Sequence, residues 1–263
     1  MTNLFEDFEH QTRTYRGVTR DLWTAGSGAP VIVMHEIPGL HPGVIAFAKR
    51  VLDAGFRVVM PSMFGQPGSE VGPIYLASSV ARACVSREFT VLATRKNSAI
   101  TDWLRDLARD EHEQTGRLVG AVGMCLTGGF ALAMMVDDHL MAPVLSQPSL
   151  PFAVTPGRCR DLGIDDETLA KVKQRCSEQG ACLMGLRFSR DLMAPASRFR
   201  RLEAELGENF IGVEIDSSIG NAHRIKPWAH SVLALDFVDR PEHPTHDALQ
   251  QVLAFFDDKL NVG

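Results

Sequence analysis

Short apolar segments alternate with amphipathic segments along most of this chain. The runs at 30–36 (PVIVMHE) and 56–62 (FRVVMPS) are apolar and rich in β-branched residues, as buried strands are. Between them, 41–55 carries apolar residues at helical spacing and ends in Gly55. We therefore predict a strand, helix, strand unit. Strands that alternate with helices of this length form a mainly parallel sheet with helices on both faces.

The alternation continues to the C-terminus. The further predicted helices cover 94–116, 130–138, 164–180, 194–207 and 246–260. The further predicted strands cover 118–124, 181–188 and 210–215, and 142–151 is predicted to be a strand that breaks into a Pro-rich loop. Residues 14–30 have strand-like residues around a glycine-rich turn that would add an antiparallel edge, whereas 63–90 lack periodicity and are predicted to form a loop with short helices. Because no linker interrupts the 263 residues, we predict a single α/β domain over 1–263.

Composition and charge exclude several classes of function. The net charge is −5 with Lys and Arg spread along the chain, so neither nucleic acid nor an anionic membrane is an expected partner. No apolar run approaches the roughly 20 residues that span a bilayer, and the acidic start MTNLFEDFEH does not resemble a secretory signal. We expect a cytoplasmic protein. Five irregularly spaced cysteines without a CxxC pair predict neither a disulfide framework nor structural zinc.

One cysteine stands at a junction between a predicted strand and a predicted helix. In 118–135 (LVGAVGMCLTGGFALAMM), Cys125 follows Gly123 by two residues, as in the G-x-S-x-G turn that presents a nucleophile, although Thr127 replaces the last glycine. Ligands of such sheets lie beyond the carboxyl ends of the strands. The N-terminus of the following helix favours an anion and hence a thiolate. We predict that Cys125 is a nucleophile; the alternative is a buried structural cysteine.

A cysteine nucleophile needs a base, and the base needs an orienting acid. In this kind of fold the acid and the histidine follow the nucleophile in chain order. Asp191 comes just after the predicted strand 181–188 and is the favoured acid, with a turn or helix-capping role as the alternative. His223 and His230 both lie between the last predicted strand and the last predicted helix. Spacing alone does not separate these two histidines.

Four motifs at these positions resemble the dienelactone hydrolase family. They are HEIPG at 35–39, GMCLTGG at 123–129, RD followed by AP within 190–195, and HS at 230–231. The resemblance extends from about Val31 onward and implies the α/β-hydrolase fold and cofactor-free hydrolysis of a lactone or carboxylic ester. It also implies a triad of Cys125, His230 and Asp191, and so selects His230 over His223. No metal is expected.

The resemblance assigns roles to residues around the nucleophile as well. In the family the glutamate of an H-E-x-x-G motif, here Glu36, contacts the resting thiol and takes part in its activation. A carboxylate at the thiol would keep it neutral until substrate displaces the carboxylate. By the same analogy, the N–H groups of Ile37 and Leu126 form the oxyanion hole. From the residues alone, Glu36 is a polar residue that closes a strand and is solvated.

The chain departs from the family where the substrate would bind. Dienelactone hydrolases hold the carboxylate of the lactone with arginines, one of them four residues after the histidine, and that position here is Ala234. Arg82 and Arg87 would supply another positive group near the site, although a surface arginine is more often only solvated. The long, Pro-rich insertion at 149–166 is expected to help cover the site. A small-molecule ester or lactone is therefore the predicted substrate, with or without a carboxylate.

Other functions are compatible with the same residues. A thioesterase or acyltransferase of this fold would use the same triad with a different acyl donor or acceptor. A non-catalytic hydrolase-fold binding protein would hold a ligand without turnover. A redox role would use Cys125 as a peroxide-sensitive thiol, although no second cysteine adjoins it in sequence. The oligomeric state and the pathway do not follow from the sequence.

Overall fold

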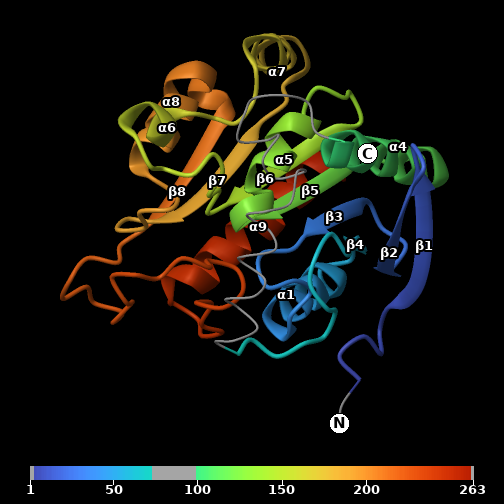
Figure 1. The fold of residues 1–263 in the computed structure, drawn as a ribbon, viewed down its shortest axis with the longest axis horizontal. Coiled ribbons are helices and arrows are strands. Elements are labelled where there is room, and N and C mark those ends of the chain that lie inside the picture. Colours follow the sequence, from blue (N-terminus) through green and yellow to red (C-terminus); the bar gives the residue numbers. More distant parts are fainter. Residues whose placement is uncertain (1–2, 73–98, 262–263) are drawn as a thin grey trace.

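The computed structural model of the chain describes residues 3–72 and 99–261. These residues form an eight-stranded sheet with the order β1-β2-β4-β3-β5-β6-β7-β8 (Figure 1). The strands are β1 (Glu9–Tyr15), β2 (Val18–Ala25), β3 (Pro30–Met34), β4 (Arg57–Pro61), β5 (Val119–Met124), β6 (Leu140–Ser146), β7 (Leu183–Phe188) and β8 (Phe210–Ile215). The pairs β1–β2 and β2–β4 are antiparallel, and all others are parallel. The predicted α/β-hydrolase fold and its antiparallel edge are thus confirmed.

Helices cover both faces of the sheet. They are α1 (Pro42–Asp53), α4 (Ala99–Thr115), α5 (Gly128–Met134), α6 (Pro156–Arg160), α7 (Asp166–Gln179), α8 (Ala196–Leu206) and α9 (Pro244–Leu260), with 3₁₀ turns at Cys125–Thr127 and Gly207–Asn209. On one face α1 and α9 pack around the buried Phe47 and Phe256, and on the other α4 and α5 pack around Trp103 and Phe130 (Figure 1). Within the two described ranges, no helix has the length and apolar character needed to cross a membrane.

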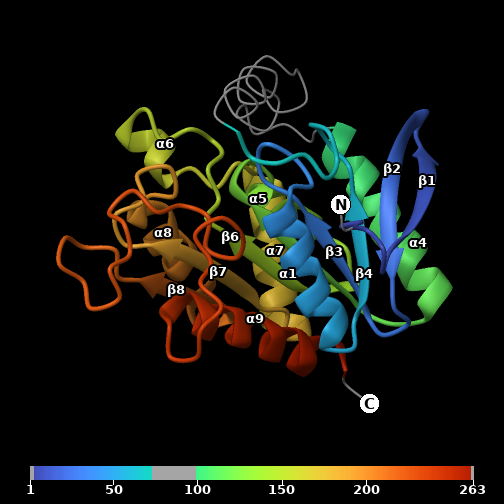
Figure 2. The ribbon, with the colours of Figure 1, turned by 90° about the horizontal axis from the view of Figure 1, so that it is seen from below.

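The burial of each strand follows its place in the sheet. Every residue of β3, β5 and β7 is buried or nearly so, because helices lie over both of their faces. By contrast, β1 and β8 lie at opposite edges and have several exposed residues (Figure 2). Continuous apolar sequence therefore marks the central strands, as expected for a parallel sheet. The central strands β3, β5, β6 and β7 end next to one another and carry the loops that form the site.

Most helix boundaries differ from the sequence prediction by one to four residues, and two of the differences have a local cause. The helix predicted at 130–138 is α5 and ends at Met134, where the N–H of Met135 donates to the carbonyl of Leu132 and tightens the last turn. The final helix α9 starts at Pro244 rather than at 246, because the imidazole of His243 accepts the N–H of Thr245 and caps it. Parts of two other predictions, 73–90 of the irregular segment and 94–98 of a helix, lie outside the described residues.

Candidate active site

Cys125 occupies a tight turn between β5 and α5. Its φ of +55° lies in the left-handed region, which residues other than glycine adopt only where the surroundings impose it. A Cβ on Gly123 would lie 2.3 Å from the carbonyl oxygen of Thr127, and one on Gly128 would lie 2.7 Å from Cα of Pro148. Only glycine therefore fits at these two positions. The turn directs the thiol beyond the end of the sheet.

Thr127 replaces the last glycine of the motif without opening this turn. Its buried hydroxyl accepts the N–H of Met124 at 2.8 Å and lies 2.9 Å from the carbonyl oxygens of both Met34 and Met124. The side chain thus ties the turn to the end of β3. A β-branched residue is accommodated because its hydroxyl satisfies main-chain groups that the turn would otherwise leave unpaired.

Asp191 follows β7 and uses its two carboxylate oxygens differently. Oδ2 lies 2.7 Å from Nδ1 of His230. Oδ1 accepts the N–H groups of Met193 at 2.9 Å and Ala194 at 3.3 Å. One oxygen therefore fixes the local turn, and the other orients the imidazole. Asp191 thus has both of the roles considered from the sequence, a turn residue and a partner of the histidine.

His230 lies in the long loop after β8 and is held by its main chain as well. Oδ2 of Asp236 accepts the N–H of His230 at 2.9 Å and that of Ser231 at 3.0 Å. Burial by itself lowers the pKa of the His230 imidazole, but hydrogen bonds with Asp191 and Cys125, and the charges of both, outweigh burial and raise it to about 11. This favours a protonated imidazole between a carboxylate and the thiol.

His223, the other candidate base, lies elsewhere. It is exposed, and its ring packs edge-on against His243 at a centroid distance of 5.6 Å. His243 in turn caps α9. The structure therefore brings His230, and not His223, to the acid Asp191.

Glu36 is buried at the end of β3 and joins three loops. Its Oε1 accepts the hydroxyl of Ser231 at 2.6 Å and lies 3.2 Å from Nε2 of His41. Its Oε2 accepts the side-chain amide of Gln147 at 2.8 Å. Ser231 follows the histidine, and Gln147 follows β6, so the carboxylate fastens the loop of the base to the loop that carries Ile37. Its hydrogen bonds therefore fix the positions of these loops relative to one another.

The thiol meets a residue that the sequence interpretation did not single out. The hydroxyl of Ser149, in the loop after β6, lies 3.5 Å from Sγ of Cys125 and 3.3 Å from Nε2 of His230. The resemblance implied that Glu36 contacts the resting thiol, but the hydrogen bonds of Glu36 are made to other side chains. Ser149 and Gln147 directly follow a buried strand, as Glu36 does, and that position was the available signal for both.

A cavity of about 310 Å³ opens beside the thiol. Its lining residues come from the loops after β3, β5, β6, β7 and β8: Glu36, Ile37, Cys125, Leu126, Ser149, Phe152, Met193, His230, Ser231, Leu235 and Asp236. The residues predicted to form the oxyanion hole, Ile37 and Leu126, are both among them. Phe152 belongs to the insertion that was expected to cover the site. The cavity therefore contains one thiol, one imidazole and mostly apolar walls.

The dienelactone hydrolase family model matches residues 24–259. The chain belongs to the dienelactone hydrolase family. No protein among curated sequences matches it. Among solved structures, it is similar to a Klebsiella pneumoniae protein assigned as a dienelactone hydrolase, with 17% identity over 95% of this chain and 97% of that chain and a TM-score of 0.62.

Two further solved structures show the same likeness. One is the dienelactone hydrolase from Anabaena variabilis, with 17% identity over 97% of this chain and 100% of that chain and a TM-score of 0.56. The other is a dienelactone hydrolase-like promiscuous phosphotriesterase from metagenomic libraries, with 13% identity over 96% and 98% of the two chains and a TM-score of 0.60. At these identities the likeness concerns the fold.

The described lining of the cavity carries acidic residues but no lysine or arginine. No Lys or Arg is among the cavity-lining residues of the described chain, whereas Glu36 and Asp236 are. Ala234 stands four residues after His230, where the resemblance implied an arginine. Arg82 and Arg87 lie outside the described residues. Apart from the imidazole of His230, the described lining residues therefore provide no cationic partner for a substrate carboxylate.

A metal site is not formed by the described residues. Across 3–72 and 99–261, no group of three or more His, Cys, Asp or Glu side chains is arranged to hold a metal ion. The four described cysteines are free thiols: Cys125, Cys159, Cys176 and Cys182.

Proposed function

We propose that this protein hydrolyses carboxylic esters or lactones through an acyl-enzyme on Cys125. The proposal rests on one observation: Asp191 bonds His230 at 2.7 Å, and His230 faces Cys125 within one apolar cavity. An orienting acid, a base and a nucleophile in this order are the parts of acyl transfer. Membership of the dienelactone hydrolase family supports the same chemistry.

Acylation begins with the thiolate of Cys125 beside the protonated His230. The sulfur attacks the carbonyl carbon of the ester, and the carbonyl oxygen takes the electron pair of the broken π bond. The N–H groups of Ile37 and Leu126 donate to this oxyanion. Leu126 lies in the 3₁₀ turn Cys125–Thr127, whose first N–H groups have no partner within it, and Ile37 lies in the loop after β3. When the intermediate collapses, the C–O bond breaks and the departing alkoxide takes the proton from Nε2 of His230.

Deacylation uses the same groups in reverse. Neutral His230 removes a proton from water, and the water oxygen attacks the thioester carbon. The second tetrahedral intermediate expels the thiolate of Cys125 and releases the carboxylic acid. Asp191 stabilises the imidazolium in both halves without taking its proton. The thiolate and the protonated imidazole are then restored.

The substrate has an uncharged, largely apolar body next to its carbonyl group. The side chains of Ile37, Leu126, Phe152, Met193 and Leu235 provide apolar walls, and the described lining residues that carry charge near neutral pH, apart from His230, are acidic. A substrate carboxylate would lie near like charges, and no described Lys or Arg lines the cavity to compensate for them. Neutral esters and lactones therefore fit better than acidic lactones. We expect kcat/KM for neutral substrates to be higher than for their acidic analogues, or lower by no more than about tenfold.

A screen of esters and lactones tests this function. The protein is assayed on p-nitrophenyl esters and small lactones, each with and without a carboxylate, and any acyl adduct on Cys125 is sought by mass spectrometry. Iodoacetamide should label Cys125 before the other cysteines and abolish hydrolysis, in the wild type and in the control Cys182→Ala. Full activity with Cys125 alkylated would exclude the proposed mechanism. A wild-type preference above 100-fold for the acidic lactone would refute the choice of substrate.

Other acyl-transfer functions are outcomes of the same screen. A thioesterase would prefer a thioester over its oxygen ester, and an acyltransferase would pass the acyl group to an added thiol or amine faster than to water. Hydrolysis that is unaffected by such acceptors supports the proposal. Binding of esters without turnover would identify a non-catalytic member of the fold.

A further inference from the structure

The hydroxyl of Ser149 lies between the two reacting side chains of the site. It is 3.5 Å from Sγ of Cys125 and 3.3 Å from Nε2 of His230. The residue is only 1% exposed, and its N–H donates to the carbonyl of Cys125 at 2.9 Å. The nucleophile and this serine are therefore held together by main chain and side chain at once.

The protonation state of His230 determines which hydrogen bonds the hydroxyl of Ser149 can form. Since Nδ1–H of His230 donates to Asp191, Nε2 carries a hydrogen only when the imidazole is protonated. In that state Nε2–H is shared between Sγ of Cys125 and Oγ of Ser149, and the single hydroxyl hydrogen of Ser149 is free to point at the sulfur. When the imidazole is neutral, Nε2 becomes an acceptor and competes with the sulfur for that hydrogen. The carbonyl oxygen of Gln147, at 3.3 Å, competes in both states.

We propose that Ser149 is a further catalytic residue, whose hydroxyl donates to the resting thiolate of Cys125 while it accepts Nε2–H of His230. A hydrogen bond to a charged acceptor is stronger than one to a neutral acceptor, so this bond stabilises the thiolate relative to the thiol. It is released when the sulfur attacks the substrate carbonyl. The inference rests on the proposed function, because it assigns Cys125 as the nucleophile.

The test follows the ionisation of the Cys125 thiol through its rate of alkylation, because the thiolate is the reactive form. The rate at which iodoacetamide alkylates Cys125 in the full-length protein is followed by mass spectrometry from pH 5 to pH 10, and the pH of half-maximal rate is compared among variants. The other titratable groups that face the thiol are Glu36, His230 and Asp236, which line the cavity, and Asp191 behind the imidazole. All four remain in every variant, so a difference reports the loss of the hydroxyl.

Three variants separate the hydroxyl from packing. Ser149→Ala should raise the midpoint by about one pH unit, which is a tenfold loss of thiolate at lower pH. Ser149→Thr keeps the hydroxyl and should remain near the wild-type midpoint. The matched control is Ser197→Ala, which removes a half-buried hydroxyl on α8 that donates to the carbonyl of Cys159 at 2.9 Å and lies outside the cavity. Circular dichroism verifies folding, and Ser149→Gly repeats the test if the alanine variant does not fold.

Each result decides one proposal. An unchanged midpoint in Ser149→Ala, or an equal shift in Ser149→Thr, would overturn the role of the hydroxyl while leaving the nucleophile intact. If alkylation of wild-type Cys125 leaves hydrolysis unaffected, the proposed function fails instead. A shift confined to variants that lack the hydroxyl, together with inactivation on alkylation, supports both.

Discussion

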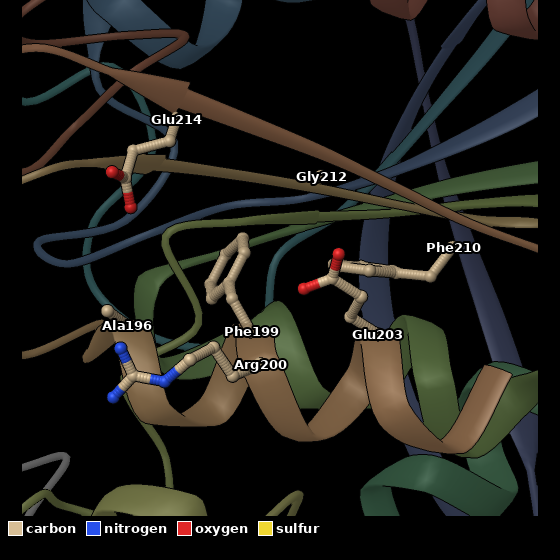
Figure 3. A pocket seen from close by; sticks show the side chains of 7 residues that line it. All are labelled: Ala196, Phe199, Arg200, Glu203, Phe210, Gly212 and Glu214. Carbon is tan, nitrogen blue, oxygen red and sulfur yellow. The ribbon is translucent and has the colours of Figure 1, made fainter. Parts of the chain in front are cut away.

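Two cavities of similar size in this protein differ in almost every other respect. The one beside Cys125 has a volume of about 310 Å³, and one between α8 and β8 has about 370 Å³ (Figure 3). The residues that line the second cavity are Ala196, Phe199, Arg200, Glu203, Phe210, Gly212 and Glu214. It has more space but contains neither a cysteine nor a histidine. Size alone therefore does not identify the site.

The difference follows from where each cavity lies on the sheet. The α8–β8 cavity runs along the side of an edge strand, where Arg200, Glu203 and Glu214 are exposed and solvated (Figure 3). The cavity at Cys125 lies beyond the carboxyl ends of the strands, where Glu36 and Asp191 are buried. A buried charge is tolerated only when it is hydrogen-bonded, so each of these carboxylates has several partners. Preorganised polar groups, and not volume, distinguish the two regions.

The largest expected difference between the two regions concerns the base. His230→Ala should reduce kcat by several orders of magnitude, because removing one member of a triad can cost as much as removing all, about 10⁶-fold in one measured protease. His223→Ala should have little effect, since this exposed ring packs against His243. Steady-state kinetics on the best ester measures both. The reverse ranking would show that His223 is the base.

A smaller loss is expected from Glu36→Gln. The carboxylate of Glu36 accepts hydrogen bonds from Ser231, His41 and Gln147. In the variant, the side-chain NH₂ group would face at least one of these donors and cannot accept its hydrogen, so at least one charge-assisted hydrogen bond is lost. We expect kcat/KM to fall by about tenfold to a hundredfold, the equivalent of roughly 1.5–3 kcal/mol. The exposed Glu203→Gln serves as the matched control. A loss as large as that of His230→Ala would show that Glu36 takes part in the chemistry itself.

A third prediction concerns stability and its dependence on pH. The pKa of His230 rises from the ordinary 6.5 to about 11 on folding, so the folded protein holds this proton more tightly than the unfolded chain. The resulting stabilisation is complete below pH 6.5 and is lost as the pH rises toward 11. In urea unfolding, the advantage of wild type over His230→Gln should therefore shrink between pH 6 and pH 10. An advantage that grows with pH would contradict the assigned charge state.

The smallest effect is expected at the α8–β8 cavity. Arg200→Ala and Glu203→Gln each change an exposed side chain, and such changes alter free energies by about 0.5 kcal/mol or less. Ester hydrolysis should thus stay within about twofold of wild type. A loss beyond tenfold in either variant, with folding intact, would mean that this cavity also contributes to the reaction.

The strands and the nucleophile turn were accessible to sequence reasoning because their signals are local. Continuous apolar runs identify β3, β5 and β7, and the glycines around Cys125 are dictated by atoms only a few positions away in the chain, apart from Pro148. Asp191 was likewise found from its place after a strand. Each of these inferences depends on a few neighbouring residues.

The remaining contacts depend on distant segments. Ser149 meets His230 across 81 positions of the chain, and Asp236 orients the histidine through main-chain N–H groups that no side-chain pattern reveals. The partners of Glu36 were missed for the same reason, and spacing alone did not separate His223 from His230. Only the closed fold decides which polar side chains at the ends of different strands meet.

The bond between Glu36 and Ser231 joins positions 195 residues apart. During synthesis, the ribosome releases Glu36 and Cys125 long before the segment that carries His230. Contacts between such distant positions form late in folding, because bringing the two positions together costs conformational entropy of the intervening chain. An incomplete nascent chain would hold Cys125 without His230 beside it, so the proposed catalytic site is completed only when the last quarter of the protein has been made and docked.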